Sequence, residues 1–156
     1  APGGGERLWD IGAGSGAVAV EWMLADPANG AVAVEPRAER VANVRANAEA
    51  FGVPDLQTVE GKAPEALEGL PAPEAVFIGG GLTTPGLVDR CYASLHAGGR
   101  LVANSVTVEG EAVLADVHAR LGGNLTRLAV ERAEPLGGFA GWSPLRTVTV
   151  WSLVVS

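Results

Sequence analysis

A run of alternating glycines after a short apolar strand constrains this chain more than any other feature of its sequence. Residues 8–16 read LWDIGAGSG, with Asp10 near the end of the strand, and the periodic apolar residues 17–24 that follow predict a helix. The glycines of the turn are Gly12, Gly14 and Gly16. A strand, a glycine turn and a helix in this order allow a backbone to approach a nucleotide closely. The run therefore predicts a nucleotide-type cofactor site near the start of an α/β fold.

The acid before the first glycine bears on which cofactor binds. S-adenosylmethionine carries a positive sulfonium and an ammonium group, which a carboxylate beside the loop attracts, whereas the pyrophosphate of a dinucleotide is repelled. We therefore predict that S-adenosylmethionine is the cofactor and that the turn holds it through Asp10, Gly12, Ala13, Gly14, Ser15 and Gly16. Residues 12–17 also fit the looser G-x-G-x-x-A form of the dinucleotide fingerprint. An NAD(P)-dependent reductase, or a glycine turn without a ligand, therefore remains an alternative.

Length and charge exclude other classes of protein. With 156 residues, of which 47% are hydrophobic, the chain is long enough for a single domain with a core. Its net charge of −7 speaks against a nucleic-acid partner, because phosphate binding needs a basic stripe. The one group of basic residues, Arg37, Arg40 and Arg45, is explained as the solvated face of a helix.

The sequence also points to a location. No apolar run reaches the ~18 residues that cross a bilayer, and residues 1–7 lack the basic start and apolar segment of a signal peptide. Cys91 is the single cysteine, so it cannot form an internal disulfide, and it has no neighbours at zinc-ligand spacing. We expect a cytoplasmic location, a buried Cys91, no metal and no membrane partner.

Apolar strands and amphipathic helices alternate along the chain. The expected strands are residues 8–11, 31–34, 56–59, 75–78 and 101–106, and the expected helices are 15–24, 36–51, 64–67, 86–95 and 109–121. Two longer strands, 125–134 and 145–154, follow without a helix between them, and a glycine-rich loop with Phe139 and Trp142 joins them. The pattern predicts a Rossmann-like α/β fold, in which a mostly parallel seven-stranded sheet ends in an antiparallel hairpin.

The carboxyl ends of the strands carry the remaining cofactor candidates, because ligands of open α/β sheets bind there. Glu35 ends the second strand about 20 residues beyond the turn, where an acid accepts both ribose hydroxyls of adenosine in either cofactor. Pro36 follows it, and Gly61, Lys62 and Ala63 end the third strand, where we expect the adenine. Gly79 and Gly80 complete this set.

The fourth and fifth strands end in a candidate substrate site. A third glycine, Gly81, leaves an open floor that suits a bulky planar substrate, although a flexible loop remains an alternative. Asn104 interrupts an otherwise apolar strand, and a buried amide needs partners, so it either contacts substrate or makes an internal hydrogen bond. The expected substrate-binding residues are Gly81, Leu82, Thr83, Asn104 and Thr107. The sequence identifies no catalytic acid or base.

Four runs, LWDIGAGSGAVAVEW, GKAPEAL, AVFIGGG and GGRLVANSVTVEGEAVL, together resemble the decarboxylating precorrin methyltransferases of cobalamin biosynthesis. Within that family the chain is similar to the carboxyl-terminal domain of precorrin-6Y methylases and to the stand-alone precorrin-8w decarboxylases. The resemblance implies S-adenosylmethionine-dependent methylation of carbon 15 of a precorrin, loss of carbon dioxide from the acetate on carbon 12, and a homotetramer. A methyltransferase of another small molecule or of a protein is the alternative, and a module that only senses S-adenosylmethionine is a further one.

The chain departs from that family in two ways. Family members often have an acid where this chain has Lys62, so backbone groups of Lys62 or Ala63 would have to recognise the adenine. Members also carry a segment before the first strand and, in two-domain proteins, an amino-terminal methylase domain. We therefore expect residues 1–156 to be one methyltransferase domain from a longer protein. Because precorrins bear many carboxylates, we further expect Arg90, Arg127 or Arg146 to offset them, so that replacing one raises KM more than it lowers kcat.

Overall fold

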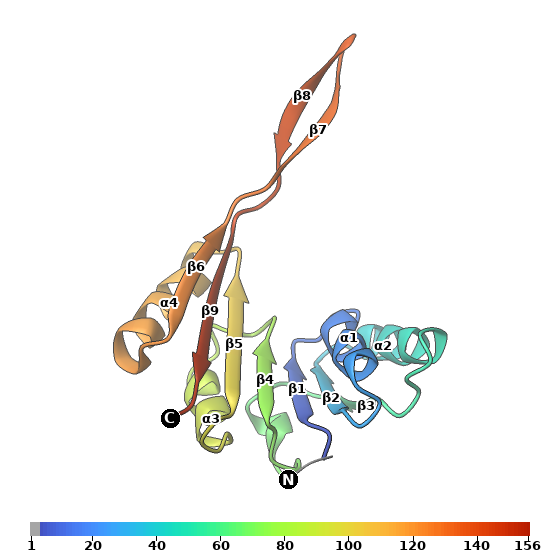
Figure 1. The fold of residues 1–156 in the computed structure, drawn as a ribbon, viewed down its shortest axis with the longest axis vertical. Coiled ribbons are helices and arrows are strands. Elements are labelled where there is room, and N and C mark those ends of the chain that lie inside the picture. Colours follow the sequence, from blue (N-terminus) through green and yellow to red (C-terminus); the bar gives the residue numbers. More distant parts are fainter. Residues whose placement is uncertain (1–3) are drawn as a thin grey trace.

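The computed structural model describes residues 4–156, which form a sheet with helices on both faces and a projecting β-hairpin near the carboxyl terminus (Figure 1). The strands are β1 (Arg7–Ile11), β2 (Gly30–Glu35), β3 (Gln57–Glu60), β4 (Ala75–Ile78), β5 (Arg100–Ser105), β6 (Asn124–Leu128), β7 (Glu131–Leu136), β8 (Phe139–Pro144) and β9 (Val148–Val154). The helices are α1 (Ala17–Ala25), α2 (Ala38–Ala50), α3 (Leu87–Ala93) and α4 (Val108–Leu121), with a short 3-10 turn, η1 (Glu65–Leu67).

Seven of the strands form one sheet in the order β3-β2-β1-β4-β5-β9-β6. Strands β1 to β5 pair in parallel, while β9 is antiparallel to both β5 and β6. This arrangement confirms the predicted α/β fold with a mostly parallel seven-stranded sheet and an antiparallel carboxyl-terminal pair. Within the described residues, no helix is long and apolar enough to span a bilayer.

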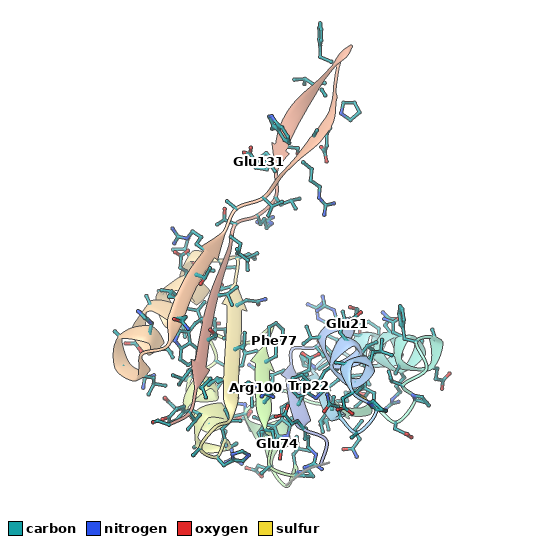
Figure 2. The ribbon with its side chains drawn as sticks, in the orientation of Figure 1. Glu21, Trp22, Glu74, Phe77, Arg100 and Glu131 are labelled. Atoms are coloured by element: carbon teal, nitrogen blue, oxygen red, sulfur yellow. The ribbon has the colours of Figure 1, made fainter. Side chains whose placement is uncertain are left out.

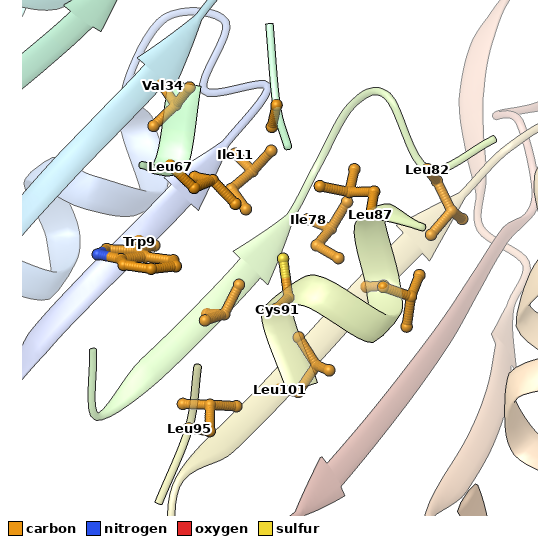
Figure 3. Packing of buried hydrophobic residues seen from close by; sticks show 14 of the residues in the cluster. Trp9, Ile11, Val34, Leu67, Ile78, Leu82, Leu87, Cys91, Leu95 and Leu101 are labelled. Atoms are coloured by element: carbon orange, nitrogen blue, oxygen red, sulfur yellow. The ribbon is translucent and has the colours of Figure 1, made fainter. Parts of the chain in front are cut away.

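Alternate residues of the strands enter two separate cores. On one face, α1 and α2 pack against β1 and β2 through small side chains such as Ala19 and Ala48. On the other face, α3, α4 and η1 cover a larger apolar cluster that includes Trp9, Leu101 and Cys91 (Figure 3). Burial along β1 and β2 is therefore nearly continuous, as expected for strands of a sheet that is covered on both faces. The expected burial of Cys91 is confirmed.

The carboxyl-terminal region differs from the prediction. The expected long strands and the loop between them are replaced by β6 and β9, which belong to the main sheet, and by a separate hairpin of β7 and β8. We call this hairpin, residues 131–144, the arm. Leu136 pairs with Phe139, so Gly137 and Gly138 form a two-residue hairpin turn. Glycines and prolines at 135, 137, 138, 141 and 144 indicated a loop, but an isolated two-stranded ribbon tolerates them because its outer edges need no partners.

Candidate cofactor and substrate site

The site forms where β1 and β4 lie side by side and their chains leave the sheet toward opposite faces. After β1 the chain passes to α1, and after β4 it passes to α3 on the other face. The amides of Gly79 and Gly80 both donate to the carbonyl oxygen of Ile11, at 2.9 and 3.2 Å. A Cβ atom on Gly12 would lie 2.5 Å from the Cα atom of Gly80. Glycine is therefore required for these two loops to approach, and the floor of the site is bare backbone.

Glu35 connects the end of β2 to the glycine turn. Its side chain is buried, and its two carboxylate oxygens accept hydrogen bonds from the backbone amides of Gly14 (3.0 Å) and Arg37 (3.2 Å). A carboxylate has about four acceptor positions, so two remain for a ligand. Glu35 thus both shapes the turn and faces the cavity beside it, in agreement with its predicted position.

A first cavity of about 290 Å³ opens at the carboxyl ends of β1, β2 and β4. Eight predicted cofactor residues line it: Gly12, Glu35, Pro36, Gly61, Lys62, Ala63, Gly79 and Gly80. The remaining predicted residues of the turn do not line it: Asp10, Ala13, Gly14, Ser15 and Gly16. The structure therefore brings together the strand ends that the sequence analysis selected, while most of the turn lies outside the cavity wall.

Arg37 and Arg40 also line the first cavity, although the sequence analysis assigned them to a solvated helix face. Both arginines follow closely after Glu35 and Pro36 at the end of the second strand. This position in the sequence is the signal that could have identified them. Together with Lys62, they put three cationic side chains around a cavity whose lining contains one acidic side chain, Glu35.

Asp10 lies beneath the turn and not in the cavity wall. Its side chain is only 1% exposed, and its Oδ2 accepts a hydrogen bond from the amide of Ala19 in α1 at 3.1 Å. The pKa of Asp10 is raised to about 6: burial is the largest cause, the Ala19 hydrogen bond opposes the rise, and the nearby charge of Glu35 adds a smaller upward contribution. Asp10 therefore ties α1 to β1, and the geometry gives no support to a contact between its carboxylate and a cationic cofactor.

A second cavity, of about 310 Å³, lies on the other side of the three glycines that end β4. It shares Gly79, Gly80 and Gly81 with the first cavity. All the predicted substrate residues line it: Gly81, Leu82, Thr83, Asn104 and Thr107. Eight predicted cofactor residues thus line the first cavity and all the predicted substrate residues line the second, and one glycine segment divides the two cavities.

The polar residues of the second cavity differ in how far they are already hydrogen-bonded. Thr107 caps α4, since its Oγ1 accepts from the amide of Gly110 at 3.1 Å, and Ser105 Oγ accepts from the Thr107 amide at 3.1 Å. The side chain of Asn104 is partly exposed and is hydrogen-bonded to no other residue among 4–156. The alternative of an internal hydrogen bond for Asn104 therefore finds no support.

The three arginines expected to offset substrate carboxylates lie elsewhere. Arg127 forms an ion pair with Glu111, and its Nε lies 3.5 Å from the hydroxyl of Thr149. Arg90 and Arg146 are exposed, and over residues 4–156 none of the three arginines lines either cavity. The same described residues hold no group of three or more His, Cys, Asp or Glu side chains that could bind a metal.

The fold and the glycine-floored site define a Rossmann-like methyltransferase domain. An S-adenosylmethionine-dependent O-methyltransferase from Thermotoga maritima superposes on 98% of the chain with a TM-score of 0.71, although only 18% of residues are identical, so this likeness concerns the fold alone. A family described as the precorrin methyltransferase domain matches residues 1–155, and the chain belongs to that family.

Individual relatives agree with the family. A precorrin-6Y C(5,15)-methyltransferase (decarboxylating) from Sinorhizobium sp is 55% identical over 97% of this chain, and one from Mycobacterium tuberculosis is 52% identical over 98%. The chain spans only 37% and 39% of the lengths of these two relatives. The crystal structure of the C-terminal domain of precorrin-6Y C5,15-methyltransferase from Rhodobacter capsulatus is 50% identical, with a TM-score of 0.88 over 97% of this chain and 82% of that one.

The position of Asp10 generates a prediction about stability. The folded state holds the Asp10 proton up to about pH 6, whereas a carboxyl with the ordinary value of 3.8 has already lost it. As the pH rises through this window, the buried charge therefore lowers the free energy of unfolding, by on the order of 2–3 kcal/mol. Asp10→Asn removes this loss, so the variant gains stability relative to the parent between about pH 4 and pH 6.

Denaturant unfolding at several pH values measures this difference. Asp26→Asn, at an exposed carboxylate that accepts a hydrogen bond from the Ala28 amide, controls for the general effect of removing one negative charge. A stability difference between Asp10→Asn and the parent that stays constant with pH would contradict the prediction.

Proposed function

We propose that this domain uses S-adenosylmethionine to methylate carbon 15 of a precorrin and decarboxylates the acetate on carbon 12, as a step of cobalamin biosynthesis in the cytoplasm. The observation that carries the proposal is the family match over residues 1–155. A probable cobalt-precorrin-6B C(15)-methyltransferase (decarboxylating) from Pyrobaculum calidifontis refines it, since the chain is 33% identical to it and covers 77% of its length. That name pairs carbon 15 with decarboxylation in a protein not much longer than this chain.

The longer relatives support a second part of the proposal. Their names include carbon 5 as well as carbon 15, and this chain spans 37% and 39% of their lengths. We assign carbon 15 and the decarboxylation to the present domain. Methylation at carbon 5 then belongs to a second methylase domain, fused at the amino-terminal side in the full-length protein.

Two features of the first cavity support the cofactor: the acceptor positions of Glu35 and the backbone at the end of β3. The cavity's volume of about 290 Å³ is close to the lower limit of ligand pockets. Glu35 has acceptor positions for ribose hydroxyls, and backbone groups of Lys62 and Ala63 are available to an adenine edge. When bound, S-adenosylmethionine supplies an electrophilic methyl group on a positive sulfur.

The glycine segment between the cavities would allow a substrate carbon to approach the methyl group of the cofactor. Because Gly79, Gly80 and Gly81 have no side chains, no side chain of this segment stands between a ligand of the first cavity and one of the second. A nucleophilic carbon must come within about 3–3.5 Å of the methyl group, in line with the bond that breaks. The chain contributes alignment to this step, and the described lining of both cavities contains no histidine or cysteine that would act as a base.

Calorimetry with S-adenosylhomocysteine, followed by turnover of a precorrin, tests the proposed function. NADH and NADPH are the controls, because Arg37, Arg40 and Lys62 around the first cavity would suit a phosphate-bearing dinucleotide. We expect micromolar binding of S-adenosylhomocysteine alone, and a product with one added methyl group and one carboxyl group fewer. Binding of a dinucleotide alone would favour the reductase, and cofactor binding without precorrin turnover would favour a different substrate or a sensing module.

Two glycines with similar backbone angles provide a matched test of the turn. Gly14 has φ +59° and Gly52 has φ +78°, and a Cβ atom on either would meet no atom within 4 Å. Alanine at either position therefore costs a similar ~1–2 kcal/mol of backbone strain. Of these two glycines, Gly14 is the one whose amide donates a hydrogen bond to Glu35. We expect Gly14→Ala to weaken S-adenosylhomocysteine binding by about tenfold or more, and Gly52→Ala to leave it unchanged; equal affinities in calorimetry would contradict this.

We further propose that the domain is a homotetramer assembled through its arm. Every large apolar side chain of the arm is exposed, including Phe139 at 86% and Trp142 at 74%, and the arm stands clear of the other elements (Figure 2). Trp142 opposes Ala133, and Pro135 opposes Ala140, so these four share one apolar face. An isolated two-stranded hairpin is marginally stable in water, and exposed apolar patches mark interaction sites. A second copy of the chain offers the same surface in return.

Removing the arm tests this assembly. We expect replacement of residues 131–144 by a short Gly/Ser link to give a folded monomer in analytical ultracentrifugation, because no arm residue belongs to either core cluster. Phe139→Ser with Trp142→Ser should act in the same direction. Phe51→Ser, at an aromatic side chain 60% exposed at the end of α2, is the control and should leave the assembly intact. A parent protein that is already monomeric at micromolar concentration would reject the proposal.

A further inference from the structure

The two cavities differ sharply in charge. The first is lined by Glu35, Arg37, Arg40 and Lys62 together with backbone and apolar groups. Within the described residues, the second cavity is lined by no ionisable side chain. Its walls are glycine backbone, Leu82 and Val106, and its polar side chains are neutral. An anion in the second cavity therefore meets hydrogen-bond donors but no countercharge.

Asn104 and Thr83 are the side-chain donors of this cavity that make no hydrogen bond to the described residues, and of the two only Asn104 is half-buried, since Thr83 is exposed. Ser105 and Thr107 already hold the first turn of α4. Asn104 lies on β5 opposite Val150 of β9, and it follows the fully buried Ala103. The side-chain amide of Asn104 has no hydrogen-bond partner among residues 4–156. A half-buried amide in an apolar strand loses hydrogen bonds to water unless something replaces them. The group that replaces them must accept a hydrogen bond from the amide nitrogen.

The chemistry of decarboxylation favours such surroundings. The bond between the acetate methylene and its carboxylate carbon breaks, carbon dioxide leaves, and the electron pair remains on the methylene carbon and spreads into the conjugated macrocycle. The methylene then takes one proton from solvent water and becomes a methyl group. An arginine or lysine beside the carboxylate would stabilise its localised charge more than the dispersed charge of the transition state, and would slow the step. A cavity without a cation avoids that stabilisation.

We propose that the second cavity holds the carboxylate that is lost as carbon dioxide, and that Asn104 orients it by donating a hydrogen bond. This inference rests on the proposed precorrin function. It assigns the two reactions to opposite sides of the glycine segment: the methyl donor lies on the charged side, and the departing carboxylate lies on the uncharged side. The positive charge around the first cavity is thereby kept away from the carboxylate.

Two substitutions at Asn104 test the proposal because they change charge in opposite directions. Asn104→Asp keeps the shape and adds a negative charge, whereas Asn104→Lys adds a positive charge. We expect both to slow carbon dioxide release by about tenfold or more, the first by repelling the carboxylate and the second by stabilising it. Asn104→Asp should also raise KM for the precorrin, and Asn104→Lys should lower kcat without raising KM.

Mass spectrometry of the products separates a gained methyl group from a lost carboxyl group, so the two reactions are followed in one assay. Asn124→Asp, at an exposed position of β6 that lines neither cavity, is the matched control and should retain both reactions. Unchanged affinity for S-adenosylhomocysteine shows that each variant is folded around the first cavity. A decrease in carbon dioxide release that exceeds the decrease in methyl transfer supports the proposal.

Other outcomes overturn it. If Asn104→Lys releases carbon dioxide as fast as the parent or faster, the cavity is a general anion site and the argument from missing charge is wrong. If the Asn104 variants lose both reactions in parallel, or neither, Asn104 has no specific part in decarboxylation. A parent chain that binds S-adenosylhomocysteine but turns over no precorrin would instead overturn the proposed function, which is a separate result.

Discussion

The contact between the backbones of Gly12 and Gly80 is the constraint on which the rest of the site depends. Strands β1 and β4 are neighbours, and each must send its chain to a different face of the sheet directly after its last residue. A side chain on Gly12 would push the second loop away, since its Cβ would lie 2.5 Å from Gly80. With glycine there, the loop after β4 lies against the loop after β1, and the space on either side of it becomes two cavities.

The division of the site by a glycine segment gives each side its own electrostatic character. The first cavity receives its charged side chains from the end of β2 (Glu35), from Arg37 and Arg40 at the start of α2, and from Lys62 after β3. The second cavity receives neutral side chains from the segment after β4 and from the end of β5 and the residues that follow it. Both cavities share the same three glycines although their other lining residues differ. Such an arrangement suits the proposed methyl transfer and decarboxylation of one large substrate.

The arm follows from the same sheet. Strand β6 runs parallel to β5, so its carboxyl end lies at the edge that bears both cavities, and the arm leaves the sheet from this edge (Figure 1). At its base, the Leu145 amide donates a hydrogen bond to the Val130 carbonyl oxygen, which joins the two links between the arm and the main sheet. An arm that contributes nothing to the core but exposes Phe139 and Trp142 has the features of an assembly element.

The sequence by itself determined the class of fold and which strand ends form the site, because the alternation of strands and helices and the glycine turn are local patterns. Glu35, the residues at 61–63 and the glycines 79–81 were located in this way, since the ends of parallel strands meet at one edge. Only the tertiary structure decided where side chains point. In the folded chain Asp10 lies beneath the loop and accepts a hydrogen bond from the Ala19 amide, because strand residues alternate between faces and position 10 faces α1. The tertiary structure also placed Arg37 and Arg40 at the first cavity and made residues 131–144 a hairpin, since both depend on how distant segments pack and pair.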